Sequence, residues 1–158
     1  MQKKNKTFIF KISSFFFSLL LVFFSIEVYV REIIDDGLNL DIEMLKYANS
    51  LKIISKNKAV GLEHKKNIEK KLMNVSIKLN SQGFRNNMDI DIEKKKILML
   101  GDSMTLGWGS IETFSNHLEK NLNQDIQVLN AGIGNTNTYM QINNFFTNFV
   151  KYDFDVII

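Results

Sequence analysis

The sequence of 158 residues contains no cysteine and no proline, and it has only two histidines. The absence of cysteine excludes disulfides, zinc sites built from thiolates and a cysteine nucleophile. It does not locate the protein, because a bacterial domain outside the cytoplasm can also lack disulfides. The missing proline accompanies an abundance of Lys, Asn, Ile and Phe, a bias that we attribute more to genome base composition than to function.

Two further classes of site are excluded by residues that the sequence lacks. The glycine-rich stretch Gly101–Ser110 has no lysine after its second glycine, so it is not a Walker-type phosphate loop. No His/Asp/Glu cluster has metal-ligand spacing, and we therefore expect neither a metal nor another cofactor. The net charge is +3, but the basic run Lys94–Lys96 has no accompanying recognition motif or aromatic pattern. It indicates a solvated loop, and no nucleic-acid partner is expected.

The amino terminus carries a long apolar run. Phe8–Val30 is almost wholly apolar, with Lys11 and Glu27 as its interruptions. About 20 apolar residues suffice to cross a bilayer, and Lys11 can extend toward the headgroups. Lysines precede the run, so the positive-inside rule places the amino terminus in the cytoplasm and the remainder in the periplasm or outside the cell. We expect an uncleaved single-pass anchor. A cleaved signal peptide is the alternative, although no Ala-x-Ala-like site follows.

Residues 32–96 read as an α+β lead-in segment outside the membrane. Apolar residues recur at helical spacing in Asp41–Lys56, which predicts a helix. Asn67–Lys71 is highly charged and expected to be exposed. Val75–Asn80 alternates apolar and polar residues, which predicts a half-buried strand. The expected organisation is therefore an anchor in residues 1–31, this accessory segment, and a further domain from residue 97.

The most informative stretch is Ile97–Gly109. Four apolar residues run into Gly101, Asp102 and Ser103, and a glycine-rich turn follows. Such a run predicts a buried parallel strand that ends at a small polar tip. Open α/β sheets bind their ligands at this carboxyl end of the strands. Ser103 is therefore a candidate nucleophile, and a serine that caps the following turn or helix is the alternative.

Several segments together resemble the SGNH/GDSL hydrolases. Gly101–Ser103 after an apolar strand is similar to the first block of that family, in which this serine is the nucleophile. Val128–Thr138 resembles the second block, and Tyr152–Ile158 resembles the strand that leads into the third. Asn80–Arg85 and Gly61–His64 look like lead-in segments of membrane-anchored members. The third block (Gly-x-Asn-Asp) and the last block (Asp-x-x-His) are absent, so the resemblance covers only the amino-terminal part of the family's domain.

The order of elements from residue 97 to 158 predicts an α/β fold. Strands are expected at Ile97–Leu100, Ile126–Asn130 and Asp155–Ile158, with helices at Ile111–Leu122 and Tyr139–Val150. This alternation implies parallel strands with right-handed crossovers. The resemblance implies a flavodoxin-like SGNH sheet, of which the first three parallel strands are present. The expected core positions on the two helices are Phe114, Leu118, Leu122, Ile142, Phe145, Phe146 and Phe149.

The final apolar strand suggests that the chain is the beginning of a longer protein, because natural termini are more often polar and frayed. From residue 97 to the end only three strands and two helices fit, which is short for a doubly wound sheet. The alternative is a short natural protein whose last strand is an edge.

The resemblance also implies roles for individual residues. Ser103 would be the nucleophile, and its backbone N–H would form an oxyanion hole with the N–H of Gly134 or Asn135. Which of these two donates stays open, because Asn135 stands where the family has glycine. Asparagine tolerates positive φ, so Asn135 can hold the turn. Asp102 directly precedes the serine and is assigned, with Gly101, a supporting structural role.

The general base of the family lies in the absent last block. His64 precedes Ser103, which is the wrong chain order, and His117 is expected at the boundary of a helix, so neither is expected to be the base. Trp108 either lines the acyl or sugar site or packs in the core.

These features lead to one function and two alternatives. The resemblance implies a membrane-anchored serine esterase or acyl hydrolase that acts on an O-acetylated polysaccharide or a lipid ester, and the chain as given is expected to be inactive alone. The alternatives are an O-acyltransferase and a non-catalytic, membrane-anchored module that binds a cell-envelope polymer.

Overall fold

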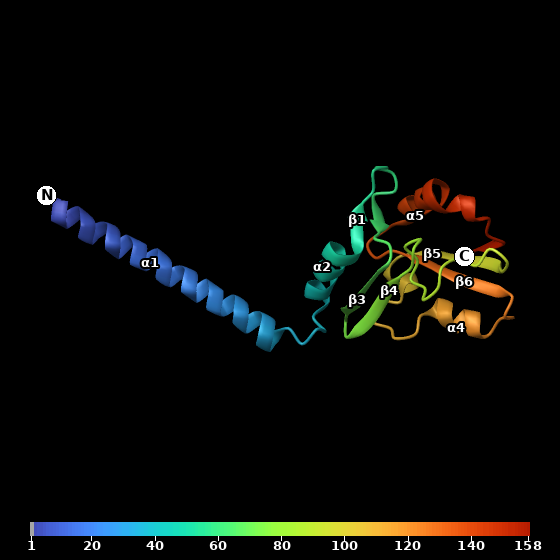
Figure 1. Ribbon diagram of the computed structural model, residues 1–158, viewed down its shortest axis with the longest axis horizontal. Coiled ribbons are helices and arrows are strands. Elements are labelled where there is room, and N and C mark those ends of the chain that lie inside the picture. Colours follow the sequence, from blue (N-terminus) through green and yellow to red (C-terminus); the bar gives the residue numbers. More distant parts are fainter. Residues whose placement is uncertain (1) are drawn as a thin grey trace. The chain divides into compact units, whose positions relative to one another are not determined.

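A computed structural model describes residues 2–158, with side chains from Phe8 onward. The chain forms two compact units that divide after Asn39. The first unit consists of α1 (Gln2–Tyr29) and the π-helical turn η1 (Val30–Ile34), drawn in blue in Figure 1. Its apolar span Phe8–Ile34 has a mean hydropathy of 2.2, and none of it is buried. At 1.5 Å per residue it is about 40 Å long, enough to cross a bilayer core of about 30 Å. Such a helix suits a membrane anchor and a signal sequence alike.

The second unit, Leu40–Ile158, contains a three-stranded parallel sheet. Its strands are β5 (Lys95–Gly101), β6 (Ile126–Gly132) and β7 (Val156–Ile157), in the order β6-β5-β7. Both neighbours of β5 run parallel to it, and Gly101 pairs with Gly132 at the carboxyl end. The expected mixed α/β fold with three parallel strands is thus confirmed.

Helices lie on both faces of this sheet, with α4 and α5 on opposite sides (Figure 1). They are α3 (Ser103–Leu106), α4 (Phe114–Lys120), α5 (Thr138–Asn144), the π-helical η2 (Phe145–Phe149) and the 3-10 turn η3 (Val150–Tyr152). Side chains of β6 alternate between the two faces. Leu129 and Ala131 pack with Phe149 of η2, whereas Asn130 bonds to Thr105 and Ser115 on the other side.

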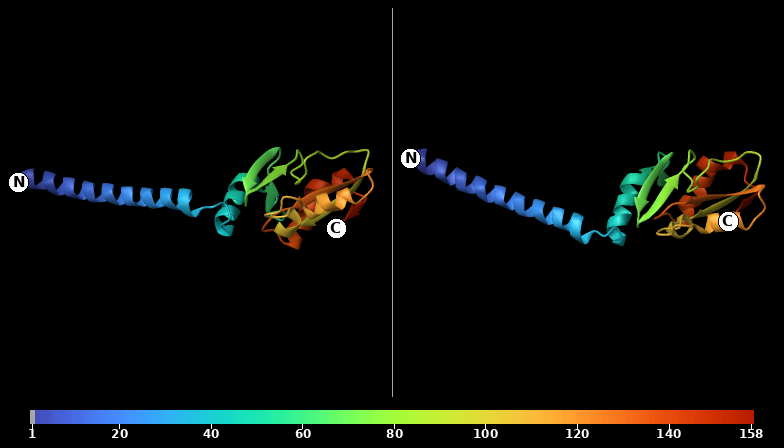
Figure 2. Two further views of the ribbon diagram at one scale, coloured as in Figure 1. Left: turned by 90° about the horizontal axis from the view of Figure 1, so that it is seen from below. Right: turned by 60° about the horizontal axis from the view of Figure 1, so that its bottom comes forward.

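The lead-in segment forms one helix and two antiparallel strand pairs. These elements are α2 (Leu40–Leu51), β1 (Lys52–Ile54) with β2 (Leu62–His64), and β3 (Ile68–Leu72) with β4 (Val75–Leu79). Figure 2 shows the green hairpin β3–β4 as a sheet separate from the parallel one. Tyr47 and Leu51 of α2 share a buried cluster with Ile77 and Leu79 of β4 and Leu106 of α3. The segment from Leu40 onward is therefore packed into the same unit as the sheet.

The outer edge of β6 is covered by the chain that follows β4. The Arg85 N–H donates to Asn130 O at 2.9 Å, and the Asn86 side chain bonds to both Asn130 N and Val128 O. The Val128 N–H donates to a Glu119 carboxylate oxygen at 2.8 Å. An edge strand whose backbone groups are paired in this way cannot recruit another strand there.

Two predicted helix boundaries are wrong. The helix predicted over Asp41–Lys56 ends at Leu51, because the β-branched residues after it pair with β2 as strand β1. The charged Asn67–Lys71 stretch is exposed as predicted, apart from the half-buried Ile68, and most of it forms strand β3. The helix predicted to start at Ile111 begins at Phe114, because the Thr113 side chain accepts the Asn116 N–H and caps it.

Two predicted core faces are also partly wrong. Phe114 is 63% exposed, and the buried residue of the first turn of α4 is Ser115. On the second helix Phe149 is buried, but Phe146 is 65% exposed. The α-helix gives way there to the π-helical turn η2, whose i→i+5 bonds move successive side chains off an i, i+4 face.

Candidate active site

Ser103 lies in the turn that follows β5, at the carboxyl end of the sheet. It is the first residue of α3, and it is half-buried. The Asp102 side chain caps this helix by accepting the Met104 N–H at 2.9 Å. Among the residues that the structure describes, the Ser103 hydroxyl has no hydrogen-bond partner. The cap is therefore provided by Asp102, which leaves the serine hydroxyl uncommitted.

Two glycines allow α3 to pack directly on the ends of β5 and β6. A Cβ atom on Gly132 would overlap the backbone of Leu106, and one on Gly101 would overlap the Thr105 side chain. The Ile133 N–H donates to Gly101 O at 3.0 Å and joins the two turns that follow the strands. The turn with Ser103 and the turn after β6 are thus held together at one edge of the sheet.

The turn after β6 contains both candidate oxyanion donors. Asn135 has φ +63°, so it adopts the left-handed conformation that asparagine tolerates better than most residues. The Gly134 N–H donates to Tyr47 Oη at 3.0 Å and is therefore already engaged. Within the described part of the chain the Asn135 N–H has no partner. Of the two, Asn135 retains a free donor.

Behind the two turns lies Asn130, which is fully buried on β6. Its Nδ2 donates to Thr105 O at 2.7 Å and to Ser115 Oγ at 3.0 Å, and its Oδ1 accepts the Gly132 N–H at 3.0 Å. One side chain therefore connects α3, α4 and the end of β6. Sequence reasoning missed this residue, although a polar side chain in the apolar strand Ile126–Ala131 was the available signal.

His64 is buried, and hydrogen bonds occupy both of its ring nitrogens. It is therefore not available as a base for Ser103. Its Nδ1 lies 3.0 Å from Gly83 O, which can only accept, so this nitrogen carries the proton. Its Nε2 lies 2.7 Å from Tyr47 Oη and accepts the hydroxyl proton. Burial lowers the pKa of His64 to about 4, with the Gly83 carbonyl partly opposing and Lys52 assisting the shift. His64 is therefore neutral, and both of its nitrogens are occupied.

His117 is exposed in the last turn of α4. α4 starts beside Asn130, which bonds to Ser115, and reaches Val128 through Glu119, so the helix runs along β6 away from the turn that contains Ser103. Neither histidine of the chain is thus placed to deprotonate the serine.

Arg85 holds the loop that follows α3. Its guanidinium donates to Leu106 O and Gly107 O, each at 2.6 Å, and to Ser110 O at 2.8 Å. This loop carries Trp108, whose ring packs at 5.3 Å from the Tyr47 ring. The contact supports a packing role for Trp108.

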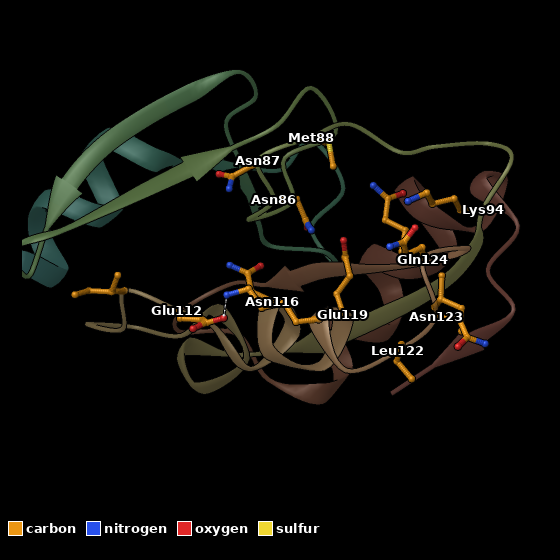
Figure 3. Close-up of a pocket in the computed structure, with 14 residues that line it drawn as sticks. Asn86, Asn87, Met88, Lys94, Glu112, Asn116, Glu119, Leu122, Asn123 and Gln124 are labelled. Atoms are coloured by element: carbon orange, nitrogen blue, oxygen red, sulfur yellow. Dashed lines mark hydrogen bonds and ion pairs between the residues drawn. The ribbon is translucent and has the colours of Figure 1, made fainter.

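An open hollow on this unit lies away from Ser103. It is an open groove of about 670 Å³ beside α4 and the start of β6 (Figure 3). Its lining mixes polar and apolar surface and includes Asn86, Asn116, Glu119 and Lys94. Because open α/β sheets bind ligands at the carboxyl ends of their strands, we place the candidate site at Ser103 and not in this groove.

Within the described residues no group of three His, Cys, Asp or Glu side chains is arranged to hold a metal ion. In comparisons with known proteins, no protein family matches the chain and no curated protein is significantly similar to it.

Proposed function

We propose that this protein is a membrane-anchored serine hydrolase of the SGNH/GDSL type that cleaves acyl esters, with Ser103 as its nucleophile. The observation that carries the proposal is the uncommitted, half-buried Ser103 hydroxyl at the carboxyl end of β5. It lies next to a turn with a free backbone donor, and Asp102 performs the capping that would otherwise explain a serine here. The finer identity of the sheet, flavodoxin-like with SGNH topology, is part of the same proposal.

In the proposed reaction the Ser103 Oγ attacks the acyl carbon while a general base accepts its proton. The N–H groups of Ser103 and Asn135 stabilise the negative charge on the acyl oxygen. Collapse of this intermediate expels the alcohol, which takes up the proton, and leaves an acyl-serine that water hydrolyses. Because His64 is neutral and engaged, and His117 is exposed on α4, which runs away from the turn of Ser103, the proposal assigns the base to residues outside these 158.

We further propose that the domain faces the periplasm or the exterior, with its amino terminus in the cytoplasm. The apolar span Phe8–Ile34 and the lysines that precede it support this orientation. The substrate class that fits this location is an acylated cell-envelope glycan or a lipid ester. A reporter enzyme that works only outside the cytoplasm should be active when fused after residue 60, and an inactive reporter would contradict this orientation.

The hydrolase is tested with p-nitrophenyl acetate on the protein translated from its complete gene. Ser103→Ala should lower kcat by about three or more orders of magnitude, because the nucleophile is lost. Ser110→Ala removes an exposed hydroxyl from the loop that follows α3 and should leave the rate unchanged.

The 158-residue chain should show no turnover of this ester above the buffer rate. Turnover by this chain that Ser103→Ala abolishes would contradict the assignment of the base. A complete protein that folds, shows no Ser103-dependent hydrolysis and binds cell-envelope polysaccharide would instead be a binding module.

A further inference from the structure

The lead-in segment reaches the turn that contains the free donor. Lys52 is 7% exposed, and its Nζ donates to Gly134 O at 3.1 Å. Tyr47 is fully buried, and its Oη accepts the Gly134 N–H at 3.0 Å. These two residues precede Gly134 by 82 and 87 positions. Both backbone polar groups of one glycine are therefore held by side chains from α2 and β1.

The bond from Lys52 has a direct geometric consequence for Asn135. Gly134 C=O and Asn135 N–H belong to the same planar, trans peptide unit, so they point in opposite directions. A side chain that fixes the oxygen thereby fixes the direction of the N–H. An ammonium group on the oxygen also polarises the peptide, which makes the N–H a stronger donor to a negative charge.

We infer that Lys52 and Tyr47 are positioning residues for the oxyanion site: together they hold the Gly134 backbone and aim the Asn135 N–H at the acyl oxygen of an ester bound at Ser103. This inference rests on the proposed function. It gives the lead-in segment a part in the reaction, which it exerts through the Gly134 backbone.

The surrounding packing keeps both side chains in place. Lys52 Nζ lies 4.6 Å from the centre of the Tyr47 ring, and Tyr47 Oη is anchored by His64 Nε2 at 2.7 Å. A Cβ atom on Gly134 would lie 2.9 Å from Tyr47 Cε1, so the glycine allows the ring to approach this closely. No carboxylate of the described residues pairs with Lys52, and its ammonium is therefore committed to the Gly134 carbonyl.

The first test measures ester hydrolysis by the protein translated from its complete gene. Lys52→Met keeps the apolar stem and removes the ammonium; it should lower kcat about tenfold with KM unchanged, less than the loss of a whole oxyanion donor. Lys52→Arg restores a cationic donor and should recover most of the rate. The matched control is Lys65→Met, which removes another lysine–carbonyl bond, to Asn49 O, and should have no effect.

The second test measures the backbone itself, by amide NMR of the 158-residue chain in detergent micelles. In Lys52→Met the chemical shift of the Asn135 amide should change more than that of any other amide in its turn. In Lys52→Arg it should stay close to the wild-type value. Tyr47→Phe removes only the hydroxyl that accepts the Gly134 N–H, so the Gly134 amide signal should shift. This variant tests the Tyr47 contact if Lys52→Met fails to fold.

The outcomes separate this inference from the proposed function. A wild-type rate in a folded Lys52→Met protein, or an Asn135 amide that does not move, would overturn the positioning role while Ser103-dependent hydrolysis stands. Absence of Ser103-dependent hydrolysis in the wild type would overturn both.

Discussion

The buried His64 predicts a specific loss of stability in mild acid. Folding places its imidazole at 5% exposure between Tyr47 Oη and Gly83 O, where only the neutral ring satisfies both partners. Burial lowers its pKa from the ordinary 6.5 to about 4. The unfolded chain therefore binds a proton more readily than the folded one. The stabilisation is complete above pH 6.5 and is lost as the pH falls toward 4.

The size of the effect follows from these two pKa values. Linkage predicts a fall in the free energy of unfolding of about 2 kcal/mol between pH 7 and pH 5, and of about 3 kcal/mol once the pH lies below 4. Carboxylates begin to bind protons in the lower part of this range, so the interval from pH 7 to pH 5 isolates the histidine best.

The assay is urea unfolding of the full chain in detergent, followed by Trp108 fluorescence. Trp108 is the only tryptophan and packs on Tyr47, so its signal reports the cluster that contains His64. His64→Gln should lower stability at pH 7 and flatten the dependence between pH 7 and pH 5. His117→Gln removes an exposed histidine and should keep the wild-type slope. Equal slopes in wild type and His64→Gln would refute the reasoning.

Substitutions at three further positions test the two turns, each by the same unfolding assay. Gly132→Ala should destabilise by about 3 kcal/mol, because its Cβ overlaps the backbone of Leu106 and must displace α3; an unchanged midpoint would contradict this packing. Arg85→Met should cost about 3 kcal/mol, since three carbonyls lose a charged donor, and a neutral result would show that water replaces it. Asn135→Gly should change stability by less than about 1 kcal/mol, because glycine reaches φ +63° without steric cost, whereas Asn135→Val should be clearly destabilising.

The parallel sheet could be predicted because its signals are local. The run of apolar residues before Gly101 and the alternation of strands and helices are visible in short windows of sequence. The hairpin β3–β4 was only half predicted. Its first strand, Ile68–Leu72, is rich in charge, and its turn places Met73 and Asn74 at positive φ in place of an Asn-Gly signal.

The two turns of the candidate site could be predicted from the sequence, but the side chains that pack against the second turn could not. Ser103 and Asn135 lie in motifs, so their neighbours in sequence identify them. Lys52 and Tyr47 reach Gly134 across more than 80 residues, and no local pattern marks such a contact. Long-range packing alone brings these side chains to the turn, which is why sequence reasoning treated the lead-in segment as an accessory.

The most direct test of the central claim is labelling of the complete gene product with a fluorophosphonate, followed by peptide mass spectrometry. A serine polarised by a general base reacts with this reagent, and an ordinary capping serine does not. The account predicts a single adduct on the peptide that contains Ser103, its loss in Ser103→Ala, and its persistence in Ser110→Ala. A folded protein that resists the reagent, or that carries the adduct on another residue, would contradict the assignment of Ser103 as the nucleophile.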